Sequence, residues 1–243
     1  MRGFRPIAEI QYLDYLMFAL QTLSDDLATV SYRSVGKQLA PLIVRTRGHR
    51  LEGMWHAGSP MGMILNSLKG MLVLTPRNMV QASGMYNTLM SCTDPALIIE
   101  PLNAYRLKEK EPLNLGEFTV PLGKIEIINP GTDITVVSYG STLKLVEKTI
   151  PELERNNINI ELIDIQSLIP FDLNKDIVES IKKTNKLLIV DEDYPGGASS
   201  FILKVLIEDH NGFKYLDSKP ITLTAKEHRT PYGSDGDYFS KPS

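Results

Sequence analysis

The sequence is poor in cysteine and tryptophan: its 243 residues include one cysteine, Cys92, and one tryptophan. A single cysteine excludes an internal disulfide and is typical of a protein from a reducing compartment. No apolar run approaches the roughly 20 residues that cross a membrane, and no apolar signal core follows Arg2 and Arg5. These absences favour a soluble, cytoplasmic protein.

Positive charge is not in excess either. Lysine and arginine total 26 against 29 aspartate and glutamate residues, which gives a net charge of −3 and a pI near 5.9. The basic residues are scattered along the chain, so the sequence offers no basic patch to a nucleic acid. We therefore expect neither nucleic acid nor membrane among the partners of this protein.

Short apolar runs alternate with helical patterns along the sequence. The expected strands lie at 6–11, 41–46, 71–76, 96–100, 134–140, 158–165, 186–193 and 220–225. The expected helices lie at 13–28, 77–91, 142–156, 173–183 and 199–210. Strands separated by helices predict an α/β fold in which helices cover mostly parallel sheets.

Residues 101–118 interrupt this alternation with prolines, charged residues and no apolar period, and we interpret them as a linker. The sequence thus predicts two α/β domains, 1–100 and 119–243. The first domain lacks a leading element at its N-terminal edge, so we expect it to be incomplete. The two ends of the chain fit cuts through a longer polypeptide and ordinary frayed termini equally well.

A loop that combines glycines with histidines follows the second expected strand. Residues 47–60, RGHRLEGMWHAGSP, contain His49, His56 and the only tryptophan. Glycine gives the backbone conformational freedom, and ligands bind at the carboxyl ends of parallel strands, so His56 is a candidate proton donor or acceptor. The same composition fits a surface loop with a solvated histidine. The spacing of the two histidines does not suit a metal pair on one helix face.

Two tyrosines, Tyr12 and Tyr15, lie where the first expected strand gives way to a helix, in EIQYLDY. An aromatic side chain at the mouth of a site can stack on a flat heterocycle. Tyrosines that begin an amphipathic helix are more often part of a core. The sequence leaves both interpretations open.

Two further strand ends carry polar residues. YGST, 139–142, opens an expected helix, and we predict an ordinary cap by Ser141 or Thr142, because the glycines of a dinucleotide site and the lysine of a P-loop are both lacking. DEDYPGG, 191–197, ends a strand with three acidic residues. A cation site, a partner surface and a solvated turn all fit this second pattern.

An ordered series of motifs extends along nearly the whole chain: GFRPIAEIQYLDY, YRSVGK (32–37), WHAGSP, DPALIIEP (94–101), VPLGKIEIINPGTDITVVSYGS (120–141), ELIDIQSLIPFD (161–172) and SIKKTNKLLIVDED (180–193). In this order the motifs resemble the beta subunit of the thiamine-diphosphate-dependent first component of 2-oxo acid dehydrogenase complexes, within the transketolase-like family. The resemblance implies a pyrimidine-binding domain over 1–100 and a transketolase C-terminal domain over 119–243.

The resemblance also implies an activity: oxidative decarboxylation of pyruvate or branched-chain 2-oxo acids, with transfer of the acyl group to lipoyl. Thiamine diphosphate would lie between subunits, with its diphosphate and Mg²⁺ held mainly by the alpha part. The implied partners are an alpha subunit or alpha part, a second beta chain and the lipoyl-bearing acyltransferase core. Tyr15 matches the aromatic residue that packs on the aminopyrimidine, and His56 matches the histidine that assists acyl transfer.

The sequence departs from the family at three places. The family's His-Ser-Gln is His56-Ala57-Gly58 here, Cys92 stands where the monovalent-cation loop usually has aspartate, and the activating glutamate of the family lies upstream of the first residues. We therefore expect the isolated chain to be inactive and to associate at least as a homodimer. Two alternatives stay open: another transketolase-like enzyme, such as a transketolase or a deoxyxylulose phosphate synthase, and a non-catalytic module for dimerisation and docking.

Overall fold

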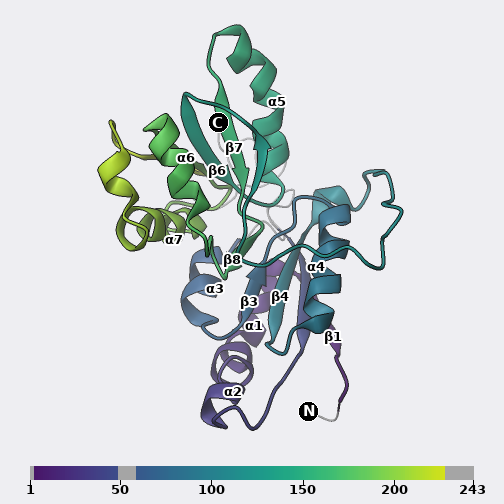
Figure 1. Ribbon diagram of the computed structural model, residues 1–243. Coiled ribbons are helices and arrows are strands. Elements are labelled where there is room, and N and C mark those ends of the chain that lie inside the picture. The colour runs from purple at the N-terminus through teal and green to yellow at the C-terminus, as the bar shows by residue number, and fades with distance from the viewer. Residues whose placement is uncertain (1–2, 49–58, 228–243) are drawn as a thin grey trace.

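The structure is a computed structural model that describes residues 3–48 and 59–227. Two five-stranded sheets form its centre, and helices cover both faces of each sheet (Figure 1). The predicted α/β fold with mostly parallel, helix-covered sheets is therefore confirmed. Within the described ranges, no helix combines the length and the apolar character that a membrane span requires.

The first sheet has the strand order β1-β2-β4-β3-β8. Its strands are β1 (Ile7–Tyr12), β2 (Ile43–Gly48), β3 (Leu72–Leu74), β4 (Ala96–Pro101) and β8 (Ser167–Ile169). The first four run parallel to one another and were expected from the sequence, whereas β8 pairs antiparallel with β3. Because β8 begins only two residues after the expected strand 158–165 and is followed by Pro170, the sequence shows no separate apolar run for it.

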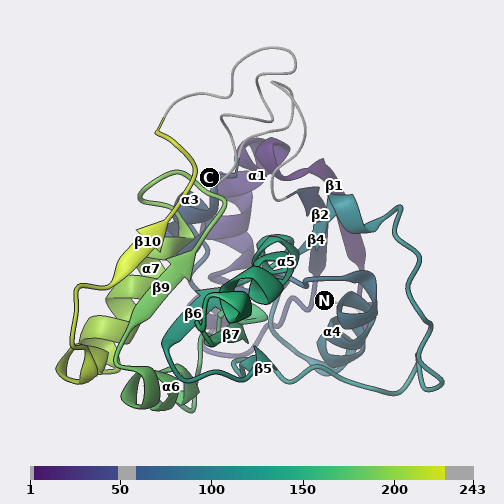
Figure 2. The ribbon, with the colours of Figure 1, turned by 90° about the horizontal axis from the view of Figure 1, so that it is seen from above.

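The second sheet has the order β10-β9-β6-β7-β5, which Figure 2 shows from above. Its strands are β5 (Glu126–Asn129), β6 (Ile134–Ser138), β7 (Ile160–Asp164), β9 (Leu187–Val190) and β10 (Ile221–Leu223). All neighbours are parallel except β5, which runs antiparallel to β7. The last four of these strands match expected strands, whereas β5 was missed.

Helices pack on both sheets (Figure 1). They are α1 (Leu16–Gln21), α2 (Val30–Arg33), α3 (Met61–Ser67), α4 (Met79–Ser91), α5 (Thr142–Arg155), α6 (Asp176–Thr184) and α7 (Ala198–Lys204). The expected helices at 13–28 and 199–210 are each composite, because α1 and α7 continue as the π-helical turns Thr22–Leu27 and Val205–Asp209. Neither α2 nor α3 was expected.

One buried apolar cluster contains residues from both sheets. It contains Val44, Val73 and Leu97 of the first sheet together with Val137 and Ile163 of the second. Successive side chains of a strand point to opposite faces of its sheet. The face of each sheet that points away from the shared cluster packs into a smaller cluster, under α4 for the first sheet and under α5 for the second. The two halves of the chain therefore share buried apolar surface, and β8 also crosses the predicted division between them. The domain limits themselves stay a prediction.

The expected linker, 101–118, begins with Pro101, the last residue of β4, and its only other regular element is one 3-10 turn, Leu102–Ala104. It is held against α4 by side-chain bonds: the Asn87 amide donates to the carbonyl oxygens of Leu115 at 2.9 Å and Phe118 at 2.8 Å. These hydrogen bonds hold the C-terminal part of the segment against α4.

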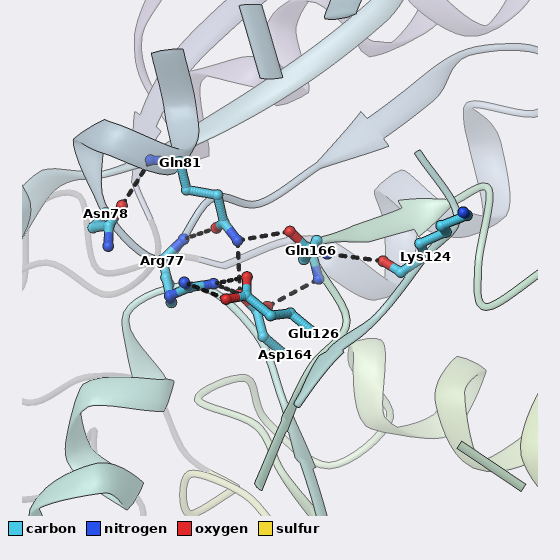
Figure 3. Close-up of polar contacts among 7 residues, drawn as sticks. All are labelled: Arg77, Asn78, Gln81, Lys124, Glu126, Asp164 and Gln166. Atoms are coloured by element: carbon cyan, nitrogen blue, oxygen red, sulfur yellow. Dashed lines mark hydrogen bonds and ion pairs between the residues drawn. The ribbon is translucent and has the colours of Figure 1, made fainter. Parts of the chain in front are cut away.

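A polar cluster joins the start of α4 to the second sheet (Figure 3). The Arg77 Nη1 atom lies 2.7 Å from Glu126 Oε2 and 2.8 Å from Asp164 Oδ2. Gln81 Nε2 donates to Asp164 at 3.0 Å and to Gln166 at 2.9 Å. The Asp164 side chain is fully buried, and its pKa is raised because burial outweighs the hydrogen bonds from Gln81 and Arg77.

Candidate functional site

The carboxyl ends of β1, β2 and β4 meet at one edge of the first sheet. Tyr12 of β1 pairs with Arg47 of β2, and Arg47 in turn pairs with Glu100 of β4. Parallel α/β sheets place their ligands at this edge. The strand pairing therefore brings the predicted Tyr15 segment, which follows Tyr12, to the edge where a site is expected.

Tyr15 ends a 3-10 turn, Leu13–Tyr15, between β1 and α1. Leu13 and Leu16 are 1% and 0% exposed and anchor this turn, whereas Tyr15 is 41% exposed. The turn also packs directly on β2, because a Cβ atom at Gly48 would lie 2.4 Å from the Cβ atom of Leu13. Tyr15 is thus an accessible ring on a fixed base, and the interpretation of Tyr15 as a core residue is wrong.

The side chains of Tyr12 and Arg47 lie next to Tyr15 in a row along the carboxyl ends of the strands. The rings of Tyr12 and Tyr15 meet edge to face, with centroids 5.8 Å apart and planes at 84°. The guanidinium carbon of Arg47 lies 4.6 Å from the centroid of the Tyr12 ring, a favourable cation–π distance. We call Arg47, Tyr12 and Tyr15 the aromatic row. Arg47 is the first residue of the loop 47–60 singled out in the sequence, but no role was predicted for Arg47 itself.

A buried carboxylate lies close to the aromatic row. Glu100, 2% exposed, accepts hydrogen bonds from Arg45 Nη2 at 2.7 Å, from the Tyr86 hydroxyl at 2.6 Å and from the Tyr105 hydroxyl. Arg45 also pairs with Glu9 of β1 at 3.2 Å. Burial and the contact with Glu100 raise the pKa of Tyr105 to about 12. The network fixes three neighbouring strands beside Tyr15.

The predicted catalytic residue His56 lies outside the described residues, as do His49, Ala57 and Gly58. Its role therefore stays a prediction. The strand that precedes these residues, β2, ends at Gly48, at the same edge of the sheet as Tyr15.

The YGST stretch is a helix start, as predicted, but not the predicted kind of cap. Ser141 is the N-cap residue of α5, yet its side chain makes no capping hydrogen bond. Its backbone is already helical, and its hydroxyl donates to Glu192 Oε2 at 3.4 Å instead. The Thr142 hydroxyl is buried without a hydrogen-bond partner among the described residues, so the predicted side-chain cap by Ser141 or Thr142 is wrong.

The acidic residues of DEDYPGG are buried, with Asp191, Glu192 and Asp193 exposed by only 0%, 6% and 2%. Asp191 accepts hydrogen bonds from the Tyr139 hydroxyl and from the backbone N–H of Ser199, each at 2.7 Å. The solvated-turn interpretation is wrong. Within the part of the chain that the structure describes, no group of three or more His, Cys, Asp or Glu side chains is arranged to hold a metal ion.

The end of α4 corresponds to the loop for which the resemblance implies a monovalent cation. Here Arg5 Nη1 donates to the carbonyl oxygen of Leu89 at 3.1 Å and to that of Cys92. Burial, together with the nearby Asp94 carboxylate, raises the pKa of the Cys92 thiol, so the thiol stays protonated. A neutral thiol is a poor ligand for a hard cation, which prefers oxygen. These residues do not fit the family's cation.

Comparison with known proteins agrees with this fold. Residues 123–237 match the family model of the transketolase C-terminal domain. A solved structure described as a split-gene transketolase in an inactive beta4 tetramer superposes on 99% of this chain and 73% of its own, with a TM-score of 0.76 and 16% identity. The protein thus has the transketolase-like α/β fold.

Two curated relatives show which family the chain belongs to. The pyruvate dehydrogenase E1 component subunit beta of Staurastrum punctulatum is 31% identical over 96% of this chain and 70% of its own length. The 2-oxoisovalerate dehydrogenase subunit beta of Bacillus subtilis is 29% identical over 86% of this chain and 64% of its own length. The chain belongs to the family of 2-oxo acid dehydrogenase E1 beta subunits.

Proposed function

We propose that this chain is the beta part of a 2-oxo acid dehydrogenase E1 component. In this role it takes part in the oxidative decarboxylation of pyruvate or a branched-chain 2-oxo acid and in acyl transfer to lipoyl. One observation carries the proposal: Tyr15, at the position that the resemblance assigns to the cofactor ring, is an exposed aromatic side chain on an anchored turn. The substrates in the relatives' names, pyruvate and 2-oxoisovalerate, support the choice of substrate class.

The proposal gives the chain one half of a shared cofactor site. Thiamine diphosphate, when bound, supplies the electron-accepting chemistry that lets carbon dioxide leave a 2-oxo acid. Tyr15 packs its ring on the aminopyrimidine, and its fixed turn suits this role because little ordering remains to be done on binding. The alpha part holds the diphosphate and Mg²⁺. His56 is proposed to hold or move a proton during acyl transfer.

The second candidate is a non-catalytic role in dimerisation with another beta chain and docking to the lipoyl-bearing core. The sequence after His56 favours it, because Ala57 and Gly58 replace two polar residues of the family. This candidate requires the same partners as the first but no turnover. The two are therefore separated by an activity measurement on the assembled complex.

The chain is to be purified with its alpha partner and assayed for carbon dioxide release from pyruvate and 2-oxoisovalerate. Thiamine diphosphate, Mg²⁺ and a lipoyl-bearing protein are added, and the oxidised lipoyl group accepts the acyl group and the two electrons. We expect turnover by the complex, none when thiamine diphosphate is left out, and none by the isolated chain. A complex that forms but turns over neither substrate would favour the non-catalytic role. Turnover of a phosphorylated sugar would indicate a transketolase or a related synthase.

A further inference from the structure

We infer that Arg47 and Tyr12 are positioning residues, which hold the ring of Tyr15 in the orientation that packs on the aminopyrimidine. The inference rests on the proposed function, because that function gives Tyr15 its ligand. The contacts within the aromatic row are observed in the structure and do not depend on the proposed function.

The strand pairing directs Tyr12 toward Arg47. Ile10 pairs with Thr46, so regular pairing would place Gln11 opposite Arg47, but the register shifts and Tyr12 takes that place. A register shift of this kind re-aims the side chains that follow it. It sets Tyr12 between the guanidinium of Arg47 and the ring of Tyr15.

Arg47 itself is held from two sides. Its Nε atom donates to the carbonyl oxygen of Gln11 at 3.1 Å, and its guanidinium lies over the Tyr12 ring at 4.6 Å. The hydrogen bond and the cation–π contact together hold the guanidinium beside the Tyr12 ring. The Tyr12 ring is then confined between Arg47 and the edge-to-face contact with Tyr15.

Arg47 differs from its neighbour Arg45 in what it binds. Arg45 forms ion pairs with Glu9 and Glu100. Among residues 3–48 and 59–227, by contrast, no acidic side chain lies within ion-pair distance of Arg47, whose contacts there are a carbonyl oxygen and a ring. Replacing Arg47 therefore leaves no carboxylate of these described residues without an ion-pair partner, and a melting temperature recorded beside each spectrum separates an effect on Tyr15 from an effect on stability.

The first test follows the Tyr15 ring without cofactor. The full chain is labelled with 3-fluorotyrosine at position 15, and its ¹⁹F NMR spectrum is recorded for the parent, Arg47→Met and Tyr12→Leu. We expect a displaced or divided resonance in both variants, with a melting temperature unchanged to within about 2 °C for Arg47→Met. The conservative variants Arg47→Lys and Tyr12→Phe keep a cation and a ring, and should give the parent spectrum. A parent-like spectrum for Arg47→Met overturns the inference.

The second test measures thiamine diphosphate affinity in the complex with the alpha partner. Loss of one half-buried cation–π contact predicts a dissociation constant about twofold to fivefold higher for Arg47→Met, with kcat unchanged at saturating cofactor. Equal affinities for parent and Arg47→Met refute the positioning role alone. A parent complex that binds no thiamine diphosphate refutes the proposed function, whereas the ¹⁹F spectra still decide whether the row orders Tyr15.

Discussion

Replacing Arg77 by methionine is expected to lower the free energy of unfolding by about 3–5 kcal/mol at neutral pH. The Asp164 side chain is fully buried, and Arg77 is its cationic partner at 2.8 Å (Figure 3). Methionine fills similar space but leaves the carboxylate of Asp164 with only neutral donors. Urea-induced unfolding of the two proteins measures the difference.

The loss caused by Arg77→Met should be smaller near about pH 5 than near about pH 8. The pKa of Asp164 is already raised by burial in the parent protein, and removal of the guanidinium raises it further. A group whose pKa is higher in the folded state binds protons on folding, so its contribution to stability falls as the pH rises through the folded pKa.

Glu126→Gln is the matched control for Arg77→Met, because Glu126 binds the same guanidinium with a side chain that is 46% exposed. An exposed ion pair of this kind contributes less than about 1 kcal/mol. Similar losses for the two variants, or a loss for Arg77→Met that does not change with pH, would contradict the role given to Asp164.

Replacing Glu100 by alanine is expected to lower the free energy of unfolding by about 2–4 kcal/mol. The change removes the buried carboxylate that accepts hydrogen bonds from Arg45, Tyr86 and Tyr105, so all three donors lose this acceptor. The expected loss lies below that for a fully buried pair because the Arg45 side chain is 31% exposed and also contacts Glu9. Urea unfolding again gives the value.

Glu9→Gln provides the control for Glu100→Ala, since both carboxylates bind Arg45. The Glu9 side chain is 53% exposed, so we expect its replacement to cost less than about 1 kcal/mol. If Glu9→Gln proved as damaging as Glu100→Ala, the buried network would not be what fixes this sheet edge.

The sequence was sufficient for most strands of both sheets, because buried parallel strands appear as continuous apolar runs. It was not sufficient for β8 (Ser167–Ile169), which begins only two residues after the expected strand 158–165 and forms no separate apolar run. Nor did it predict α3, which follows Pro60 without a capping side chain. Elements this short form through tertiary packing, which local patterns do not report.

The candidate site was predictable only in part. Tyr15 was a candidate from the sequence, the resemblance assigned its role, and the fold added its exposure and its anchored turn. Glu100 and Asp164 were missed because their partners are distant in sequence, at 55 residues for Arg45 and 87 for Arg77. Arg47 was missed because a register shift places it on Tyr12, and a strand pattern gives no information on such shifts.

The most direct test of the central claim is a calorimetric titration of thiamine diphosphate into the complex of this chain with its alpha partner, for the parent and for Tyr15→Ala. Our account predicts binding by the parent, and an affinity at least about tenfold lower for Tyr15→Ala, because a ring contact and its buried area are lost together. Equal affinities for the two proteins would contradict it, since Tyr15 would then not contact the cofactor.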